Sequence, residues 1–364
     1  MSSTCGKNIK FTIFGQSHSQ AVGVVIEGLP PGESINMDHI AAFMARRAPG
    51  KTPWSTPRKE EDMPEIISGV FNGKTCGVPL CAVIANNNTK SQDYEKIKDI
   101  PRPGHGDFTG HIKYAGYEDY RGGGHFSGRL TAPLCFAGAI AKDILAKRQI
   151  FIGAHIAEIG GIQDKPFDPI KVTPLDLEMP GKMEFPVQNY NIGDTMIAKI
   201  MLTKEKGDSL GGIIEGCAIG LPPGLGDPIF DGLENNLAKA AFGIPAVKGV
   251  EFGAGFAAAG KLGSENNDAF IWENDIIKTE TNNHGGILGG ISTGMPLIMR
   301  IAIKPTPSIA QIQKSVNMKD KKNADLNIQG RHDPCIVPRA VPVLESVMAL
   351  TILDQLMERN KSCK

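Results

Sequence analysis

Three short loops, far apart in the sequence, each combine a histidine with glycine or proline and with a second polar or charged residue. They read Gly15-Gln16-Ser17-His18-Ser19, Arg102-Pro103-Gly104-His105-Gly106-Asp107 and Gly330-Arg331-His332-Asp333-Pro334. Histidine titrates near neutral pH, so it is the usual proton donor or acceptor in catalysis. Because the chain has only eight histidines, three such loops indicate a site assembled from distant segments.

These loops leave several kinds of chemistry open. Each histidine taken alone could be a surface or packing residue, and His18, His105, His332 and Asp333 could bind a metal. The sequence has no His-x-His or His-x-x-x-His spacing to support a metal site. It also has no Gly-x-Ser-x-Gly elbow of the kind found in serine hydrolases. We therefore predict proton transfer and no metal.

Arginines accompany the same turns. Arg47 ends a predicted helix, Arg102 and Arg331 precede loop histidines, and Arg129 follows a glycine-rich stretch. An arginine fork binds a carboxylate or phosphate through two hydrogen bonds. Any one of these arginines could instead be a solvated surface charge. Their repeated placement beside histidine-bearing turns predicts a ligand with several negative charges.

Two glycine-rich stretches and one proline turn could bind such a ligand. The stretch from Arg121 to Arg129 (RGGGHFSGR) runs into a predicted helix, where backbone N–H groups can hold an anion. The GGILGGIS stretch after His284 would let a flat ligand approach the backbone, and the Lys304–Ser308 turn (KPTPS) offers a cation and two hydroxyls to a phosphate. Neither glycine stretch fits the P-loop or dinucleotide pattern. The alternative for each is a tight turn that requires glycine.

The elements that must position these loops are mixed. Predicted strands cover Phe11–Phe14, Val22–Ile26, Glu65–Val70, Pro79–Ala85 and Gly211–Ile219, and predicted helices cover Met37–Arg47, Leu130–Arg148, a segment around Met196 that ends near Gly207, Leu233–Phe242 and Val343–Met357. Asn36 could cap the first helix, and Ala137-Gly138-Ala139 would allow close packing of the second. The Pro- and Asp-rich segment Ile162–Gln188 predicts a loop. Because strands and helices do not alternate strictly, an α+β fold is favoured.

Composition limits the class of protein. The chain has 364 residues, 41% hydrophobic and 21% charged, with 39 basic and 39 acidic residues, so no net charge favours nucleic acid. Seven scattered cysteines without Cys-x-x-Cys spacing argue against a disulfide framework and for a reducing compartment. The sequence lacks about 18 uninterrupted apolar residues for a membrane span and a signal-peptide core. We predict a cytoplasmic protein with no nucleic-acid or membrane partner.

Taken together, the motifs resemble the chorismate synthase family. The GQSHS, RPGHGD, GGG…SGR, GGILGGIS, KPTPS and GRHDPC…PRAVPVLES motifs occur in that family's order and cover nearly the whole chain. Any one of them is weak evidence, but six in order are highly specific. The resemblance implies one chorismate synthase-like domain over residues 1–364. It also implies a β-α-β sandwich with helices packed between antiparallel sheets, and a homotetramer.

The resemblance also implies a reaction. The family is a group of lyases that convert 5-enolpyruvylshikimate 3-phosphate into chorismate and phosphate by 1,4-anti elimination with reduced FMN (FMNH2). A reduced flavin can lend electron density to the allylic phosphate ester and recover it when the hydrogen leaves. Some family members also reduce their own flavin with NAD(P)H. The chain has no separate nucleotide domain, which favours an external flavin reductant.

Site residues are assigned by the same resemblance. His105 would help protonate the departing phosphate, His18 would lie against the flavin ring, and Asp333 would handle the proton at a flavin nitrogen. Ser17 and Ser127 would hydrogen-bond in this relay. The substrate-binding set would be Arg47, Arg102 and Arg129. The FMN-binding set would be His125, Phe126, Ser127, Ala246, Gly289, Lys304, Pro305, Thr306, Pro307, Ser308 and Arg331.

Some residues depart from the family pattern. Gln16 stands where a Glu is usual, and His125-Phe126 stands where Arg-Ser is usual. These departures motivate the alternative of a non-catalytic homologue that binds FMN or a phosphorylated ligand. Because the residues with assigned proton roles are intact, we predict an active enzyme.

Overall fold

The N-terminal third of the chain builds an antiparallel sheet. The computed structural model describes residues 3–50, 52–56, 62–87, 98–328 and 333–362. The strands of this sheet follow the order β1-β2-β3-β7-β4, with every neighbouring pair antiparallel. They are β1 (Thr4–Cys5), β2 (Lys10–Gly15), β3 (Ala21–Glu27), β7 (Leu80–Ala85) and β4 (Pro64–Ser68). On β3, Val22, Val24 and Ile26 are buried and turn the same face of the sheet towards the core.

A second antiparallel sheet comes from the later part of the chain. Its order is β11-β16-β10-β8-β9. The strands are β11 (Val247–Phe252), β16 (Leu297–Ile303), β10 (Gly212–Ile219), β8 (Phe151–Ile159) and β9 (Ile162–Gln163).

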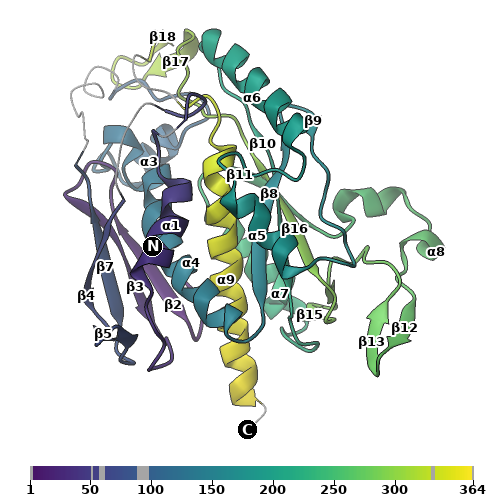
Figure 1. Cartoon of the computed structure of the whole chain (residues 1–364). Helices are drawn as coiled ribbons and strands as arrows, with labels where there is room; N and C mark the ends of the chain where they lie inside the picture. The colour runs from purple at the N-terminus through teal and green to yellow at the C-terminus, as the bar shows by residue number, and fades with distance from the viewer. Residues whose placement is uncertain (1–2, 51, 57–61, 88–97, 329–332, 363–364) are drawn as a thin grey trace.

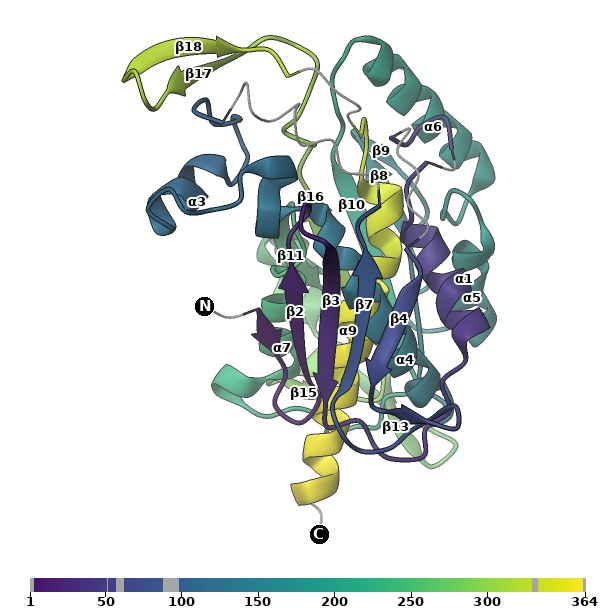
Figure 2. The same cartoon turned by 90° about the vertical axis from the view of Figure 1, so that its left-hand side faces the viewer.

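Three helices lie between the two sheets: α1 (Met37–Arg47), α4 (Thr131–Ala146) and α9 (Val337–Ser362) (Figure 1). Figure 2 looks onto the first sheet, with α4 and α9 behind it. This arrangement confirms the predicted α+β fold and the sandwich of helices between antiparallel sheets. The segment Val337–Arg359 of α9 is long and apolar enough to cross a membrane, but 94% of its most apolar stretch is buried, as in a core helix.

The remaining elements surround this sandwich. The helices are α3 (Asp107–Lys113), α5 (Pro174–Lys182), α6 (Tyr190–Glu205), α7 (Leu233–Ala241) and α8 (Gly263–Asn266). The hairpins are β5–β6 (Val70–Phe71, Lys74–Thr75), β12–β13 (Phe270–Glu273, Ile276–Thr279), β14–β15 (Ile287–Leu288, Ile291–Ser292) and β17–β18 (Gln313–Asn317, Lys322–Leu326).

Most predicted elements are confirmed, as β2, β3, β7, β10, α1, α4, α6, α7 and α9. The predicted strand Glu65–Val70 is instead split into β4 and β5 at Gly69, whose φ is +88°. The predicted loop Ile162–Gln188 is wrong in part, because it contains β9 and α5. A capping box starts α5: the backbone N–H of Asp176 donates to Thr173 Oγ1, and that of Thr173 donates to the Asp176 carboxylate.

Helix α9 begins at Val337, six residues before the predicted start at Val343, and continues through Pro342. The predicted close packing of α4 is also confirmed. A Cβ atom on Gly138 would lie 2.1 Å from the Cβ of Ser346 on α9, so only glycine permits this approach.

Buried charges tie the three central helices together. Glu345 of α9 is 1% exposed. It accepts hydrogen bonds from Arg46 of α1, at 2.5 and 3.1 Å, and from Lys142 of α4. Because an unpaired buried charge is costly, this arrangement disfavours any sliding of one helix past another.

A second buried charged group lies in the other sheet. His155 of β8 is 0% exposed, and its Nε2 lies 3.2 Å from Glu215 Oε1 while its Nδ1 lies 3.5 Å from Asp164 Oδ2. Arg300 approaches the other oxygen of Glu215 at 3.5 Å. Burial disfavours the charged imidazole, but the two carboxylates outweigh it and raise the pKa of His155 above its ordinary value.

This shift predicts a pH-dependent contribution to stability. A histidine whose pKa is raised by folding stabilises the protein fully below the ordinary value of about 6.5, and the contribution is lost as the pH rises through the raised value. We expect His155→Gln to lower the free energy of unfolding at pH 6 by about 2 kcal/mol or more. The variant should also lose less stability than the wild type between pH 6 and pH 8. Urea unfolding at both pH values measures this, and equal losses in the two proteins would contradict the assignment.

Candidate active site

A left-handed glycine turn brings two of the histidine loops together. Gly122, Gly123 and Gly124 have φ values of 60°, 90° and 51°. A Cβ on Gly122 would lie 2.3 Å from the ring of His18, and one on Gly123 would lie 3.0 Å from the ring of His105. The backbone of this turn therefore separates the two imidazoles, and any side chain there would displace them. The turn lies within η1 (Arg121–Phe126), and η2 (Gly128–Leu130) follows before α4 begins.

The loop that carries His105 is organised by Asp107. Nδ1 of His105 lies 2.6 Å from Oδ1 of Asp107, so a proton on Nδ1 faces the carboxylate and Nε2 faces the glycine turn. Arg102 donates from Nε and from its second terminal nitrogen to the same carboxylate, each at 2.7 Å. Burial opposes ionisation of Asp107, but the hydrogen bonds from Arg102 and His105 prevail and hold its pKa well below the ordinary value.

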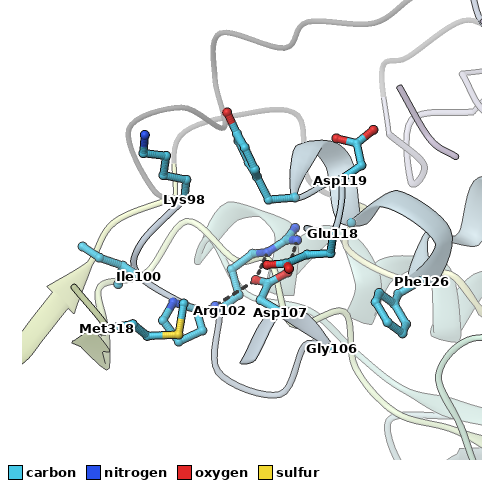
Figure 3. A pocket seen from close by; sticks show the side chains of 12 residues that line it. Lys98, Ile100, Arg102, Gly106, Asp107, Glu118, Asp119, Phe126 and Met318 are labelled. Carbon is cyan, nitrogen blue, oxygen red and sulfur yellow. Dashed lines mark hydrogen bonds and ion pairs between the residues drawn. The ribbon is translucent and has the colours of Figure 1, made fainter. Parts of the chain in front are cut away.

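A small cavity adjoins Arg102 and Gly123 of the glycine turn. Figure 3 shows Arg102 beside Asp107 in the centre, with Ile100 and Met318 on one side of them and Phe126 on the other. The lining carries both signs of charge: Lys98 and Arg102 are basic, whereas Asp107, Glu118 and Asp119 are acidic. Because Asp107 already neutralises Arg102, the cavity does not present an uncompensated guanidinium at this point.

The Lys304–Ser308 turn packs against the same loop. Lys304 Nζ donates to the carbonyl oxygen of Gly104, and Arg102 donates to Ser308 Oγ at 3.3 Å. The backbone N–H of Lys304 donates to Ala246 O at 3.0 Å, and Ala246 has a φ of +75°. Burial, together with the charge of Lys248, lowers the pKa of Lys304. The structure thus brings three residues of the predicted FMN set, Lys304, Ser308 and Ala246, to the loop that carries Arg102 of the predicted substrate set.

Asp333 lies close to this turn through a shared neighbour. The Ser209 hydroxyl donates to Thr306 O at 2.7 Å, and the next residue, Leu210, donates its N–H to Pro334 O at 2.8 Å. Asp333 itself accepts a hydrogen bond of 2.5 Å from Arg339. Arg331 and His332, also predicted for the site, lie outside the described residues.

Arg47 and Arg129 come together on Asp62. Each donates to one oxygen of that carboxylate, and all three residues are less than 9% exposed. Arg129 Nε also donates to Asn86 Oδ1 at 2.9 Å. The amide of Asn86 donates to the backbone oxygens of Gln16 and Ser19, at 3.0 and 2.9 Å, on either side of Ser17 and His18. The arginine pair is therefore linked to the first histidine loop.

His125 and Phe126 serve the packing of these loops. His125 Nδ1 lies 2.9 Å from Gly15 O, and Nε2 lies 2.8 Å from Ser3 Oγ. Phe126 covers the glycines at the start of α3, where a Cβ on Gly110 would lie 2.8 Å from its ring. Ser127 Oγ accepts the N–H of Arg129 at 3.2 Å. Ser17 is buried, and its hydroxyl lies 3.2 Å from Nδ1 of His18.

Gly289 lies apart from this group within the chain. It belongs to the β14–β15 turn, next to Gly290. Gly285, two residues before β14, accepts the N–H of Ile298 at the start of β16, whereas Lys304 follows the end of β16. A strand of this length spans roughly 20 Å, so Gly289 and Lys304 sit towards opposite ends of it.

Sequence reasoning did not find three members of the site: Asp62, Asn86 and Arg339. Each acts through a contact with a residue that was predicted. Asp62 binds Arg47, Asn86 binds Arg129 and Arg339 binds Asp333. The only sequence signal for Arg339 is its place in the PRAVP motif, and Asp62 and Asn86 have no comparable pattern.

The chain resembles one family of known proteins over almost its full length. The family model described as chorismate synthase matches residues 9–357. A chorismate synthase of Dehalococcoides mccartyi is 48% identical over 359 residues, covering 97% of this chain and 96% of the relative. One of Pyrococcus abyssi is 48% identical over 355 residues and covers 97% of both chains. A crystal structure of a chorismate synthase superposes with a TM-score of 0.74 at 28% identity, covering 97% of this chain and 93% of that one.

The glycine turn can be tested with a matched pair of substitutions. Gly122→Ala adds a Cβ to a residue with positive φ and drives it into His18 and Ser17, whereas Gly73→Ala adds one at φ +72° with open space around it. We expect Gly73→Ala to cost about 1 kcal/mol from backbone strain alone and Gly122→Ala to cost at least about 1 kcal/mol more. Urea unfolding of both variants measures the difference, and equal losses would show that the turn does not constrain His18.

Proposed function

Because the chain belongs to the chorismate synthase family, it is an enzyme that forms chorismate in the shikimate pathway, and we propose that it does so with reduced FMN and with proton transfers by His18, His105 and Asp333. The observation that carries the proposal is the meeting of the His18 and His105 loops on one glycine turn. Around that turn lie a lysine and arginines from four segments, which suits a substrate with two carboxylates and a phosphate.

His105 is oriented as a proton donor to the departing phosphate. Asp107 binds the Nδ1 side of its ring and leaves Nε2 directed towards the glycine turn. A half-buried, ionised partner of this kind fixes both the tautomer and the ring orientation of a catalytic histidine. Arg102 holds the same carboxylate and so keeps it in place beside His105.

His18 and Asp333 would act on the other side of the reaction. His18 is half-buried beside Ser17, where it can supply or steady a proton. Asp333 is held by Arg339 and would accept the proton that follows the substrate's hydrogen. When bound, reduced FMN supplies electron density to the allylic system and recovers it, so the elimination has no net redox change.

The residues present fit an FMN phosphate at the Lys304–Ser308 turn. The buried hydroxyl of Thr306 has no hydrogen-bond partner among the described residues, so it is available to a ligand oxygen. Lys304 supplies a positive charge and Ser308 a second hydroxyl on the same turn. His125, Phe126, Ser127 and Ala246 would border the flavin, and Gly289 and Arg331 complete the proposed set.

The substrate's anionic groups would be bound by Arg47, Arg102 and Arg129. Arg47 and Arg129 share one carboxylate, which holds the two guanidinium groups close together. The alternative of a non-catalytic homologue is less well supported, since the proton-handling residues are all present and the departures at Gln16 and His125 fall on residues with structural contacts.

The assembly and the location are part of the proposal. The β12–β13 hairpin projects from the body of the protein (Figure 1) and exposes Phe270, Trp272 and Ile276, which are 67%, 75% and 59% exposed. An apolar surface of this kind supports association of several chains, and we assign a homotetramer. We also assign a cytoplasmic location and an external flavin reductant, and we take residues 1–364 as one domain.

The proposed function predicts chorismate formation under anaerobic conditions. The purified protein, incubated with 5-enolpyruvylshikimate 3-phosphate and chemically reduced FMN, should release chorismate and phosphate. Absence of product from folded protein that binds both ligands would refute the proposal. In the same preparation, consumption of NADPH or NADH in the presence of oxidised FMN would show that the protein reduces its own flavin and needs no external flavin reductant.

A substitution separates the role of His105 from folding and flavin binding. We expect His105→Ala to lower kcat by about 100-fold or more, the usual contribution of a general acid, while the Kd for FMN changes less than about threefold. Turnover and fluorescence titration of FMN measure the two quantities. Equal losses in both would instead indicate that His105 is structural.

A further inference from the structure

A short segment, Gly207–Gly211, lies between α6 and β10 and packs against the Lys304–Ser308 turn. Ser209 Oγ donates to the backbone oxygen of Thr306 at 2.7 Å, across 97 positions of the sequence. Ser209 is 9% exposed, so little water competes for this hydrogen bond. The Ser209 hydroxyl thus holds the middle residue of a turn that belongs to a different part of the chain.

The segment is itself fixed on both sides of Ser209. Before this residue, Gly207 O accepts the N–H of Ala310 at 2.9 Å. After it, Leu210 donates its N–H to Pro334 O at 2.8 Å. Because its two flanks are bound to different segments, Ser209 can act as a rigid anchor for the turn.

The turn lies between this segment and the loop that carries His105. A Cβ atom on Gly211 would lie 3.0 Å from the ring of Pro305, so glycine is what lets the segment approach the turn this closely. From the turn, Lys304 Nζ donates to Gly104 O in the His105 loop. The position of the turn is therefore set from two directions.

The middle of the turn carries a polar group that awaits a partner. The hydroxyl oxygen of Thr306 is buried and has no hydrogen-bond partner among the described residues. A buried hydroxyl without a partner is unfavourable, so other contacts must keep Thr306 in place until a ligand binds, and Ser209 supplies one of them. A ligand can reach the turn, because Pro305 is exposed and Thr306, Pro307 and Ser308 are partly exposed.

We propose that Ser209 is a positioning residue of the flavin site. By holding the carbonyl of Thr306, it fixes the backbone of the turn and so the directions in which Lys304, Thr306 and Ser308 meet the phosphate of FMN. A site that is organised in advance binds more tightly, because less order has to be imposed when the ligand arrives. The inference rests on the proposed function, because that function assigns the turn to FMN.

The test is the Kd for FMN of Ser209→Ala, measured by fluorescence titration. Loss of one buried hydrogen bond to the turn should raise this Kd about fivefold or more. Riboflavin has the same ring and lacks the phosphate, so its Kd should rise by a smaller factor. With saturating, chemically reduced FMN, KM for 5-enolpyruvylshikimate 3-phosphate should change less than about twofold, since Arg102 keeps its contacts with Asp107.

Thr75→Val is the matched control. Thr75 is also buried, and its hydroxyl donates to Pro30 O at 2.6 Å, so it too joins two segments that are distant in the sequence. It belongs to β6, which pairs with β5 at the opposite end of the molecule from α6 (Figure 1). This variant should lower the Tm and leave the Kd for FMN at the wild-type value. A role for Ser209 in stability alone would make the two variants behave alike.

Each outcome decides the proposal. An unchanged Kd for FMN in folded Ser209→Ala would overturn it, and so would an equal rise for FMN and riboflavin, which would show that Ser209 acts on the ring. If Ser209→Ala does not fold, Ser209→Cys keeps a side chain of similar size with a weaker donor, and an unchanged Kd for FMN there overturns the proposal. Wild-type protein that neither binds FMN nor forms chorismate would refute the proposed function itself. Wild-type turnover with an unchanged Kd in the variant would refute only this inference.

Discussion

The geometry of the candidate site depends on a stretch of backbone that can carry no side chains. Three successive glycines in the left-handed region place their main chain directly against the rings of His18 and His105. An L-residue there would meet both a conformational penalty and a steric one. His18 and His105 are 87 positions apart in the sequence. Their loops can approach one another only because the turn between them carries no side chains. The same turn then leads into α4, so the site is attached to the central helix layer.

From this turn, polar contacts run around the whole site and return to their start. Several of these contacts join distant segments of the chain, so the site residues are held by more than one element at once. The first half of the path runs from His105 through Arg102 to the Lys304–Ser308 turn, and from there through Ser209 and Leu210 to Pro334 and Asp333. The second half runs from Asp333 through Arg339 to Arg47, and on through Asp62, Arg129 and Asn86 to Gln16, which precedes Ser17 and His18. A substitution in any member is therefore expected to move its neighbours, and effects of single changes in this ring will not be additive.

The features that could be predicted from the sequence are those set by interactions between residues close together in the chain. Helix α1 has its predicted bounds because its signals are local: Asn36 caps it and Pro49-Gly50 follow it. Helix α5 was missed because it is short and its signal, the Thr173–Asp176 capping box, lies in a Pro-rich segment. The partners of the predicted site residues were missed for a different reason. Asp62 and Arg129 are 67 positions apart, and only the packing of the first sheet on α4 brings such residues together, so no local pattern marks the carboxylate.

Charge compensation is the rule that connects these partners. Arg102 is paired with Asp107, Arg339 with Asp333, and Arg47 and Arg129 with Asp62. Buried guanidinium groups repel one another and lose their hydration in a low-dielectric interior. A protein that buries several arginines must therefore compensate their charges with other groups. Internal carboxylates meet this requirement and fix directions as well as charge. Where carboxylates equal arginines in number, the pair orients a neighbouring group, as Asp107 does for His105. At Asp62, one carboxylate fixes the directions of two guanidinium groups at once.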